Sequence, residues 1–420
     1  MPSRKAIILG AGPAGLAAAL RLQQQTDIEC TIYELRSTPT TLGGAVGIPS
    51  NGQRLLHRLG VWDQAHSRGF SGSNLTMHSL SGSIVASSDF VGWARERTGF
   101  GYMRIKRTDI VDVLLDAVQK AGIPVQFGKK LSALSESESG VSATFDDGEV
   151  VQADLLLGCD GIHSFVRSKY VDPGYAPVYS GISTLGSVIP ASVLSAETLA
   201  QLNGLESTMT EKGMLAVNPC TAGKEEVFMF FSKFLQLPEA GDSRDGWTAH
   251  GKEEVESYRS DLRKMVEHAK GTWGDALREL AHGVSDVHFY PIYRLPLGGK
   301  WSRGRVVLVG DAAHAMSPHA GQGVSMALED VFLLARLLKD PARPLDEAFE
   351  KYDAIRRPRV DEIFTMAANN ARNRKATGTW GLWFKELAIS MFMNVSWALG
   401  LDRSGKGQHH LVYDIDEAEI

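Results

Sequence analysis

KAIILGAGPAGL, at Lys5–Leu16, is the stretch on which the fold depends. Its first five residues form an apolar run that suits a buried β-strand, and a helix-forming run follows the glycines. Gly10 permits a tight turn, Gly12 leaves room for a ligand beside the backbone, and Gly15 permits close packing of helix on strand. A strand, a glycine-rich turn and a helix in this order predict the first unit of a doubly wound α/β fold.

An acidic residue at the expected distance supports this interpretation. A second apolar strand, residues 30–33, ends at Glu34, about 20 residues beyond Gly15. In dinucleotide-binding folds a carboxylate at this spacing binds a ribose hydroxyl, and the helix N-terminus stabilises the phosphates. The sequence therefore predicts a dinucleotide site.

A second strand-loop-helix unit lies at residues 304–330, GRVVLVGDAAHAMSPHAGQGVSMALED. The apolar strand ends at Asp311, and open α/β sheets place their ligands at this end of their strands. A turn-rich loop, Pro318–Gly323, leads into an expected helix at 324–338. The first N–H groups of that helix carry partial positive charge and can stabilise an anion.

Several segments between these two units extend the pattern. The glycine-rich run at 42–51 allows backbone approach to a flat ligand, and alone it could equally be a surface loop. Arg107 precedes an amphipathic helix at 110–121, where by itself it would be a solvated cation. A β-meander is expected at 125–151. Another strand, 153–157, ends in Gly158-Cys159-Asp160-Gly161.

The rest of the chain changes character. Residues 173–287 are expected to form a separate sheet-and-helix region without nucleotide motifs, the natural place for a substrate site. The last part, 341–420, is mainly helical. Its uncharged run, 387–401, is shorter than the roughly 20 residues needed to span a bilayer. A helix packed on the protein body is therefore expected, rather than a membrane anchor.

Composition narrows the class of protein. The 420 residues carry a net charge of −5, which argues against a nucleic-acid partner. The three cysteines form no CxxC pair, so no disulfide framework or metal site is indicated. No secretory signal is visible, and a cytoplasmic location is expected.

Together these motifs resemble the flavoprotein monooxygenases of the para-hydroxybenzoate hydroxylase type, called class A, with salicylate hydroxylase-like members as similar relatives. The resemblance runs from residue 5 to about 359 and rests on motifs in the family's order. These are the glycine turn with Glu34, Arg107 before its helix, CDGIHSFVR at 159–167, GDAAH at 310–314, Pro318, and GQG at 321–323.

The resemblance implies an α/β fold of three parts. The first is a Rossmann-like FAD-binding domain with a parallel sheet and a β-meander. The second is a substrate domain with a mainly antiparallel sheet, and the third is a C-terminal helical segment. The FAD-binding domain would comprise residues 1–76, 102–178 and 283–370, the substrate domain 77–101 and 179–282, and the helical segment 371–420.

The resemblance also implies roles for matching residues. Glu34 would bind the adenosine ribose, Asp311 a ribityl hydroxyl, and the backbone at 323–324 the pyrimidine side of the flavin. Pro318 would line the reaction chamber, where His319 is a candidate base, whereas His314 is expected to be structural. The full set expected to bind FAD is Gly10, Gly12, Gly15, Glu34, Ala45, Val46, Arg107, Asp160, Gly161, Asp311, Gly323 and Val324.

The implied chemistry has two halves. NADPH or NADH, bound transiently, reduces a non-covalently held FAD. The reduced flavin then takes up dioxygen, and a flavin hydroperoxide delivers one oxygen atom to the substrate. Neither a nucleic-acid partner nor membrane association is expected, and the protein would be a monomer or a homodimer.

The sequence departs from the family at the expected substrate site. Many phenol-hydroxylating relatives carry Trp-Arg-Gly where this chain has Leu185-Gly186-Ser187, and Phe228-Met229-Phe230-Phe231 replaces a substrate-binding Tyr. Phe228 and Phe230 are therefore expected to bind a neutral, hydrophobic substrate. An aromatic, terpenoid, indole or polyketide scaffold would be hydroxylated or epoxidised.

Other functions remain open on the sequence alone. A salicylate-type phenol hydroxylase is one, and a flavin-dependent dehydrogenase or reductase that transfers no oxygen is another. A halogenase is disfavoured because Trp380-Gly381-Leu382-Trp383 has the wrong spacing for that class's tryptophan motif. A non-catalytic protein is disfavoured because all the FAD motifs are present.

Overall fold

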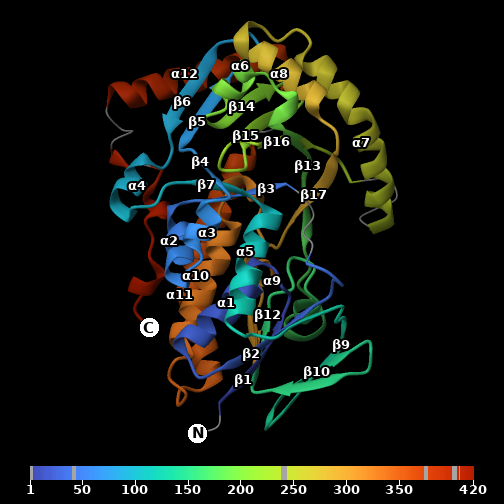
Figure 1. Ribbon diagram of the computed structural model, residues 1–420, viewed down its shortest axis with the longest axis vertical. Helices are drawn as coiled ribbons and strands as arrows, with labels where there is room; N and C mark the ends of the chain where they lie inside the picture. Colours follow the sequence, from blue (N-terminus) through green and yellow to red (C-terminus); the bar gives the residue numbers. More distant parts are fainter. Residues whose placement is uncertain (1–2, 40–43, 238–243, 373–376, 400–403, 406) are drawn as a thin grey trace.

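The computed structural model describes residues 3–39, 44–237, 244–372, 377–399, 404–405 and 407–420. Two domains lie end to end (Figure 1). One, here called the α/β domain, is built on a mainly parallel sheet near the N-terminus. The other, called the sheet domain, carries a large, mainly antiparallel sheet with helices on its outer side.

The α/β domain contains a six-stranded sheet in the order β18-β19-β12-β1-β2-β8. β1 pairs in parallel with β2 and β12, and β12 pairs in parallel with β19, as expected for buried strands joined through helices. The strands are β1 (Lys5–Leu9), β2 (Glu29–Glu34), β8 (Val125–Phe127), β12 (Leu155–Gly158), β18 (Ser302–Arg303) and β19 (Val306–Leu308).

Helices pack around this sheet, and α1 contacts both α5 and α10. α1 also packs on β1 and β2, whereas α3 and α4 pack on α2, and α11 packs on α10. The helices of this domain are α1 (Pro13–Gln25), α2 (Ser50–Leu59), α3 (Trp62–His66), α4 (Gly92–Thr98), α5 (Arg107–Lys120), α9 (Asp311–His314), α10 (Gly323–Leu337) and α11 (Leu345–Arg372).

Two small sheets complete the α/β domain. The predicted meander is confirmed as β9 (Leu131–Ser137), β10 (Gly140–Phe145) and β11 (Val150–Ala153). The glycine-rich run at 42–51, left open as a loop, instead provides strand β3 (Ala45–Ile48) in a sheet with β7 (Met103–Lys106) and β4 (Phe70–Ser71). Residues 40–43 lie outside the described part of the chain.

The sheet domain has seven strands in the order β17-β13-β16-β15-β14-β5-β6. All neighbours are antiparallel except β14 and β5. The strands are β5 (Asn74–His78), β6 (Ile84–Asp89), β13 (Val178–Pro190), β14 (Gly204–Thr210), β15 (Gly213–Pro219), β16 (Glu226–Phe234) and β17 (His288–Arg294). The helices are α6 (Ala196–Gln201), α7 (Arg244–Val266) and α8 (Gly271–Gly283).

Each domain has its own hydrophobic core. One core lies around β1, β2 and β12 with α1, α5 and α10, and the other lies between β13–β16 and α7–α8. Within β16 the residues alternate: Val227, Met229 and Phe231 belong to the core under the helices. Phe228 and Phe230 therefore point to the opposite face of the sheet.

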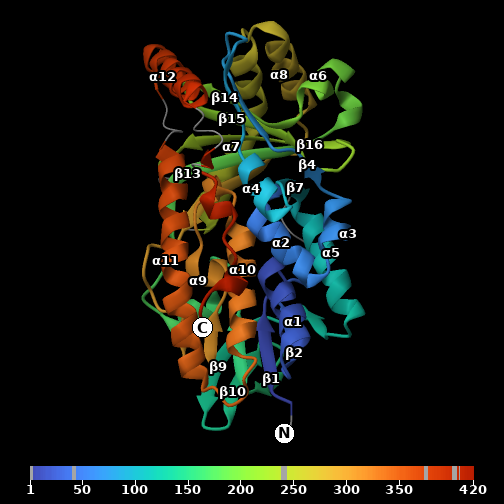
Figure 2. The same cartoon turned by 90° about the vertical axis from the view of Figure 1, so that its left-hand side faces the viewer.

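The C-terminal segment passes from one domain to the other and back (Figures 1 and 2). After α11, helix α12 (Thr379–Ala398) lies against β6 of the sheet domain. The chain then returns to the α/β domain, where Arg58 pairs with Asp414 at 2.6 Å. The expected helix does lie on the protein body, against β6, but none of the residues of α12 is fully buried there. None of the helices in the described ranges has the length and hydropathy that a bilayer crossing requires.

Candidate active site

The first glycine turn has the geometry that its spacing predicts. Gly10 has φ of +103°, and a Cβ there would lie 2.4 Å from the carbonyl oxygen of Cys159. A Cβ on Gly15 would lie 2.0 Å from the Gly10 carbonyl oxygen, so helix and strand meet here. A Cβ on Gly12 would meet nothing within 4 Å. Gly10 and Gly15 are thus required by packing, whereas Gly12 opens onto space where a ligand can approach the backbone.

Glu34 lies beside this turn. One carboxylate oxygen accepts a hydrogen bond from the backbone N–H of Ala11 at 2.7 Å, and the other accepts from that of Arg36 at 2.9 Å. The backbone thereby orients the carboxylate at the end of β2, next to the N-terminus of α1. A carboxylate in this position can accept a hydrogen bond from a ribose hydroxyl.

Asp160 and Gly161 follow β12, the neighbour of β1. Asp160 accepts hydrogen bonds from the backbone N–H groups of Phe165 at 2.7 Å and Val166 at 3.1 Å, so one of its oxygens holds the turn. Burial raises the pKa of this carboxyl. The fully buried Arg167 donates to the carbonyl oxygen of Ala312 at 2.8 Å. It therefore ties the Asp160 turn to the loop that carries Asp311.

Ala45, Val46 and Arg107 are brought together by backbone pairing. Ala45 is opposite Lys106 in the β3–β7 ladder, and the N–H of Arg107 donates to the carbonyl oxygen of Gly44 at 3.0 Å. Gly44 has φ of +95°, a conformation that favours glycine. The small residues of β3 and the exposed Arg107 thus lie side by side and form one wall of the candidate site.

Asp311 begins α9 directly after Gly310, whose φ is +62°. Its side chain is solvent-accessible, yet the protein that surrounds it raises its pKa, while the charges of His314 and Arg107 act in the opposite direction. Arg107 therefore lies close enough to Asp311 to act on it electrostatically.

A buried ionic network supports the Asp311 loop from behind. Asp330 accepts from the backbone N–H of Gly310 at 2.9 Å and contacts Nε2 of His314 at 2.6 Å. Arg356 pairs with Asp330 at 2.8 Å and with Glu329 at 2.6 Å, and all three side chains are inaccessible to solvent. Burial alone would raise the pKa of Asp330, but His314 and Arg356 outweigh it and hold that pKa below its usual value. The structure places His314 in this network.

The N-terminus of α10 carries buried polar atoms that no other described group satisfies. Asn51 donates to Gln322 at 3.0 Å, but its own oxygen, Nε2 of Gln322 and Oγ of Ser325 have no hydrogen-bond partner among the described residues. No side chain caps α10, and a Cβ on Gly323 would meet nothing within 4 Å. Buried polar groups are normally satisfied. The feature of this helix end that a ligand can use is the open backbone at Gly323, beside the unsatisfied first N–H groups.

The two residues predicted to act in the reaction chamber lie just before this helix. Pro318 begins a short 3₁₀ turn and is exposed, and His319 is half-buried. Asn370 of α11 donates to the backbone carbonyl of His319 at 3.1 Å. This bond holds the loop that carries Pro318 and His319 against α11.

The predicted substrate residues face the α/β domain. Phe228 and Phe230 stack with ring centroids 5.5 Å apart. A Cβ on Gly44 would lie 3.1 Å from the Phe228 ring, so the sheet meets β3 at this point. Glu226, on the same face of β16, pairs with Lys106 of β7 at 2.6 Å. The two phenylalanines therefore lie between the sheet and the wall formed by β3 and Arg107.

The supporting network was missed at the sequence level. His314 was expected to be structural, but Asn51, Glu329, Asp330 and Arg356 were not singled out. A signal was present, because Glu329 and Asp330 interrupt an otherwise apolar helical run. Two adjacent acids in such a helix require a buried cation, and the sequence does not say which arginine supplies it.

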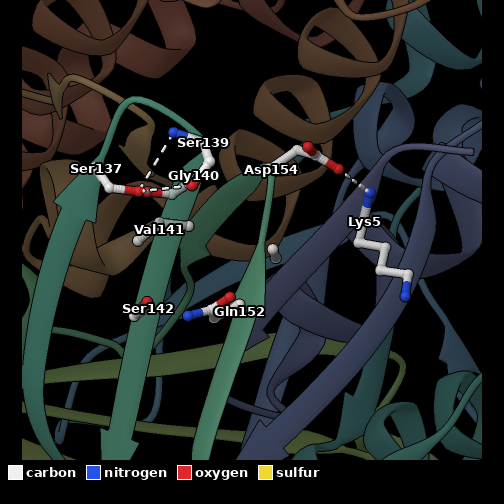
Figure 3. A pocket seen from close by; sticks show the side chains of 9 residues that line it. Lys5, Ser137, Ser139, Gly140, Val141, Ser142, Gln152 and Asp154 are labelled. Atoms are coloured by element: carbon white, nitrogen blue, oxygen red, sulfur yellow. Dashed lines mark hydrogen bonds between the residues drawn. The ribbon is translucent and has the colours of Figure 1, made fainter.

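A hollow of about 190 Å³ lies elsewhere, between the meander and the start of β1 (Figure 3). It is lined mainly by serines and small residues, and Asp154 accepts from the backbone N–H of Lys5 at 2.7 Å across it. Ligand pockets usually enclose about 300–1,000 Å³. The hollow is smaller and contains none of the predicted site residues, so it is not the active site.

Several known proteins are similar to this chain in sequence and in architecture. The profile of a family described as FAD binding domain matches residues 4–254 and 296–367, and the chain belongs to this family. It is 28% identical over 361 residues to 3-amino-4-hydroxybenzoate 2-monooxygenase from Streptomyces cremeus, covering 86% of this chain and 85% of the relative. It is 28% identical over 374 residues to 6-hydroxynicotinate 3-monooxygenase from Pseudomonas fluorescens, covering 88% and 91%.

A solved structure shows the same fold. The crystal structure of Klebsiella pneumoniae HpxO complexed with FAD and uric acid superposes with a TM-score of 0.79 at 24% identity, covering 96% of this chain and 97% of that one. The resemblance to class A flavoprotein monooxygenases is thereby confirmed, as is the predicted fold class. The cofactor is FAD, and the family is that of FAD-dependent aromatic hydroxylases.

Proposed function

We propose that the protein is an NAD(P)H-dependent FAD monooxygenase that hydroxylates or epoxidises a neutral, largely apolar aromatic or polycyclic molecule. The observation that carries this proposal is the surface around Phe228 and Phe230. Their neighbours across the ladders on either side are Val188, Gly186, Asn218 and Ala216, none of which is charged. A carboxylate would find no counter-charge among these residues.

The site geometry supports the following roles for the chain's residues. The glycine turn and Glu34 would hold the adenosine end of FAD, and Arg107 and Asp311 would hold its middle. The open N-terminus of α10 would stabilise negative charge at the pyrimidine edge. FAD, once reduced by the nicotinamide, would supply the oxygen activation.

The substrate would lie against Phe228 and Phe230. The aromatic face orients a flat apolar molecule without a charge partner, and burial between the domains excludes water. Relatives act on 3-amino-4-hydroxybenzoate and 6-hydroxynicotinate, whose names denote small aromatic acids. A neutral substrate therefore distinguishes this proposal from simple transfer of a relative's activity.

The test is a substrate panel that measures NAD(P)H oxidation and product mass together. Uncharged polycyclic or prenylated aromatics should stimulate oxidation and gain one oxygen atom, while salicylate and hydroxybenzoates should not. Coupled hydroxylation of a small aromatic acid would refute the neutral-substrate proposal. Arg294, which stacks on Phe364 at 5.3 Å, would then be the first cation to test. Oxidation of a substrate without oxygen gain would instead indicate the dehydrogenase alternative.

A further inference from the structure

Helix α12 presents its apolar residues to solvent. Its outward side chains are between 41% and 78% exposed, although they are large and hydrophobic. Six of them, Trp380, Trp383, Phe384, Leu387, Met391 and Val395, follow one side of the helix and are here called the α12 stripe, while Phe392 and Trp397 are exposed beside it. With about 150–250 Å² for each large side chain, the stripe exposes on the order of 700 Å² of apolar surface. Monomeric proteins rarely expose a contiguous apolar patch of this size.

The charged residues of α12 face inward. Lys385 and Glu386 are half-buried, and Glu386 accepts a hydrogen bond from Ser79 of the sheet domain at 2.9 Å. At the N-terminus of the helix, Thr379 donates to Glu211 at 2.7 Å. These polar contacts fix the helix on the domain with its stripe outward. The orientation is therefore set by specific bonds.

The spacing of the stripe is that of a helix-pairing seam. Trp380, Phe384, Leu387 and Met391 recur at intervals of four and three residues, as in helices that pack along their length. A 20-residue helix is about 30 Å long, enough for an extended contact. A stable interface buries about 800 Å² on each partner, close to what the stripe offers.

We propose that the α12 stripe is a self-complementary interface through which two copies of this chain form a homodimer. Two α12 helices pack antiparallel about a two-fold axis near Leu387, the middle residue of the stripe. Aromatic and methionine side chains with no charge among them are the composition of an interface core. A lipid surface is the less suitable occupant, because the stripe offers no cation and the chain carries a net charge of −5.

The first experiment measures mass in solution by sedimentation of the FAD-loaded protein at micromolar concentrations. We expect twice the chain mass for the wild type. Leu387→Glu and Met391→Glu should each weaken dimerisation at least about 100-fold, because each would bury an unpaired charge. Val150→Glu, at an exposed site on β11, is the matched control and should leave the dimer intact. A monomeric wild type, or charged variants that stay dimeric, would overturn the proposal.

A second experiment does not depend on disrupting the helix. Leu387→Cys should cross-link to its own copy under mild oxidation, whereas Val150→Cys should not. The native cysteines do not interfere, because all three are buried and burial raises the pKa of Cys30 and Cys220 to about 12. Equal cross-linking of both variants would contradict the interface. So would a monomer that co-sediments with phosphatidylserine vesicles, since a membrane would then be the occupant.

Discussion

At the scale of single residues, the three glycines of the first turn were expected to serve different purposes, and the backbone geometry agrees with that division. Gly10 and Gly15 are needed because the chain passes close to itself, whereas Gly12 faces open space. That Gly12 lies against a bound cofactor remains a prediction.

Matched substitutions separate these purposes. Gly15→Ala should destabilise the protein by about 1–3 kcal/mol, because the new methyl group would overlap the Gly10 carbonyl. Gly12→Ala should change the stability of the FAD-free protein by less than about 0.5 kcal/mol, yet weaken FAD binding. Urea unfolding and fluorescence titration with FAD measure the two effects. Equal loss of stability in both variants would contradict the assignment.

Asp311 allows a test of the ribityl contact. We expect Asp311→Ala to fold but to lose about 1.5–3 kcal/mol of FAD binding, since a charged hydrogen-bond acceptor is removed. This corresponds to roughly a 10–150-fold rise in the dissociation constant. Asp112→Ala, an exposed acid on α5, is the control and should bind FAD normally. Unaltered affinity in Asp311→Ala would remove this residue from the site.

At the scale of elements, the strands and helices around the nucleotide motifs were predicted well because local patterns determine them. The helix expected at 324–338 is α10, and the strand expected at 153–157 is β12. Within the sheet-and-helix region expected at 173–287, no local pattern marked β14, since its run LESTMT mixes polar and apolar residues and is buried only by its place in the sheet. The outward face of α12 was also missed, because periodicity defines a helix's faces without saying which one meets the protein.

The buried network between α10 and α11 yields an element-scale prediction. Arg356→Leu should destabilise the protein by about 3–5 kcal/mol at pH 7, because Glu329 and Asp330 would remain buried without their cation. Lys351→Ala on the same helix removes a surface pair with Glu347 and should cost less than about 0.5 kcal/mol. Urea unfolding measures the free energy of unfolding of Arg356→Leu and of Lys351→Ala, each against the wild type.

The same network predicts a pH dependence with a definite sign. The pKa of Asp330 is lower in the folded state than in the unfolded state, where it is about 4. The contribution of this carboxylate to the free energy of unfolding is therefore complete above about pH 4 and is lost as the pH falls further. In Arg356→Leu the lowering influence of Arg356 is gone and burial favours protonation. The stability difference between the two proteins should therefore shrink from pH 7 to pH 4. A difference that grows on acidification would show that Arg356 does not act through this carboxylate.

At the scale of the whole molecule, the sequence indicated that distant motifs share one site but could not show how the domains meet. That meeting depends on the Lys106–Glu226 pair and on Phe228 packing near Gly44. Both contacts join β16 to the sheet of β3 and β7. Long-range contacts of this kind leave no local pattern, so Phe228 and Phe230 could be named from the sequence, but their contacts with the other domain could not.

The assembled site predicts where FAD binding should change hydrogen exchange. Comparing FAD-free and FAD-loaded protein, we expect slower exchange at residues 10–15, 44–47 and 310–324, because backbone N–H groups there would be covered or held. Binding should also stabilise the fold, by about 2.7 kcal/mol at a hundredfold excess of FAD over its dissociation constant. α8, in the core beneath the sheet, and the meander β9–β11 serve as internal references. They lie away from the assembled residues, so their local exchange should change only as far as global stability does. Protection centred on the meander, with none at residues 10–15, would place the cofactor at the hollow of Figure 3 and contradict the site described here.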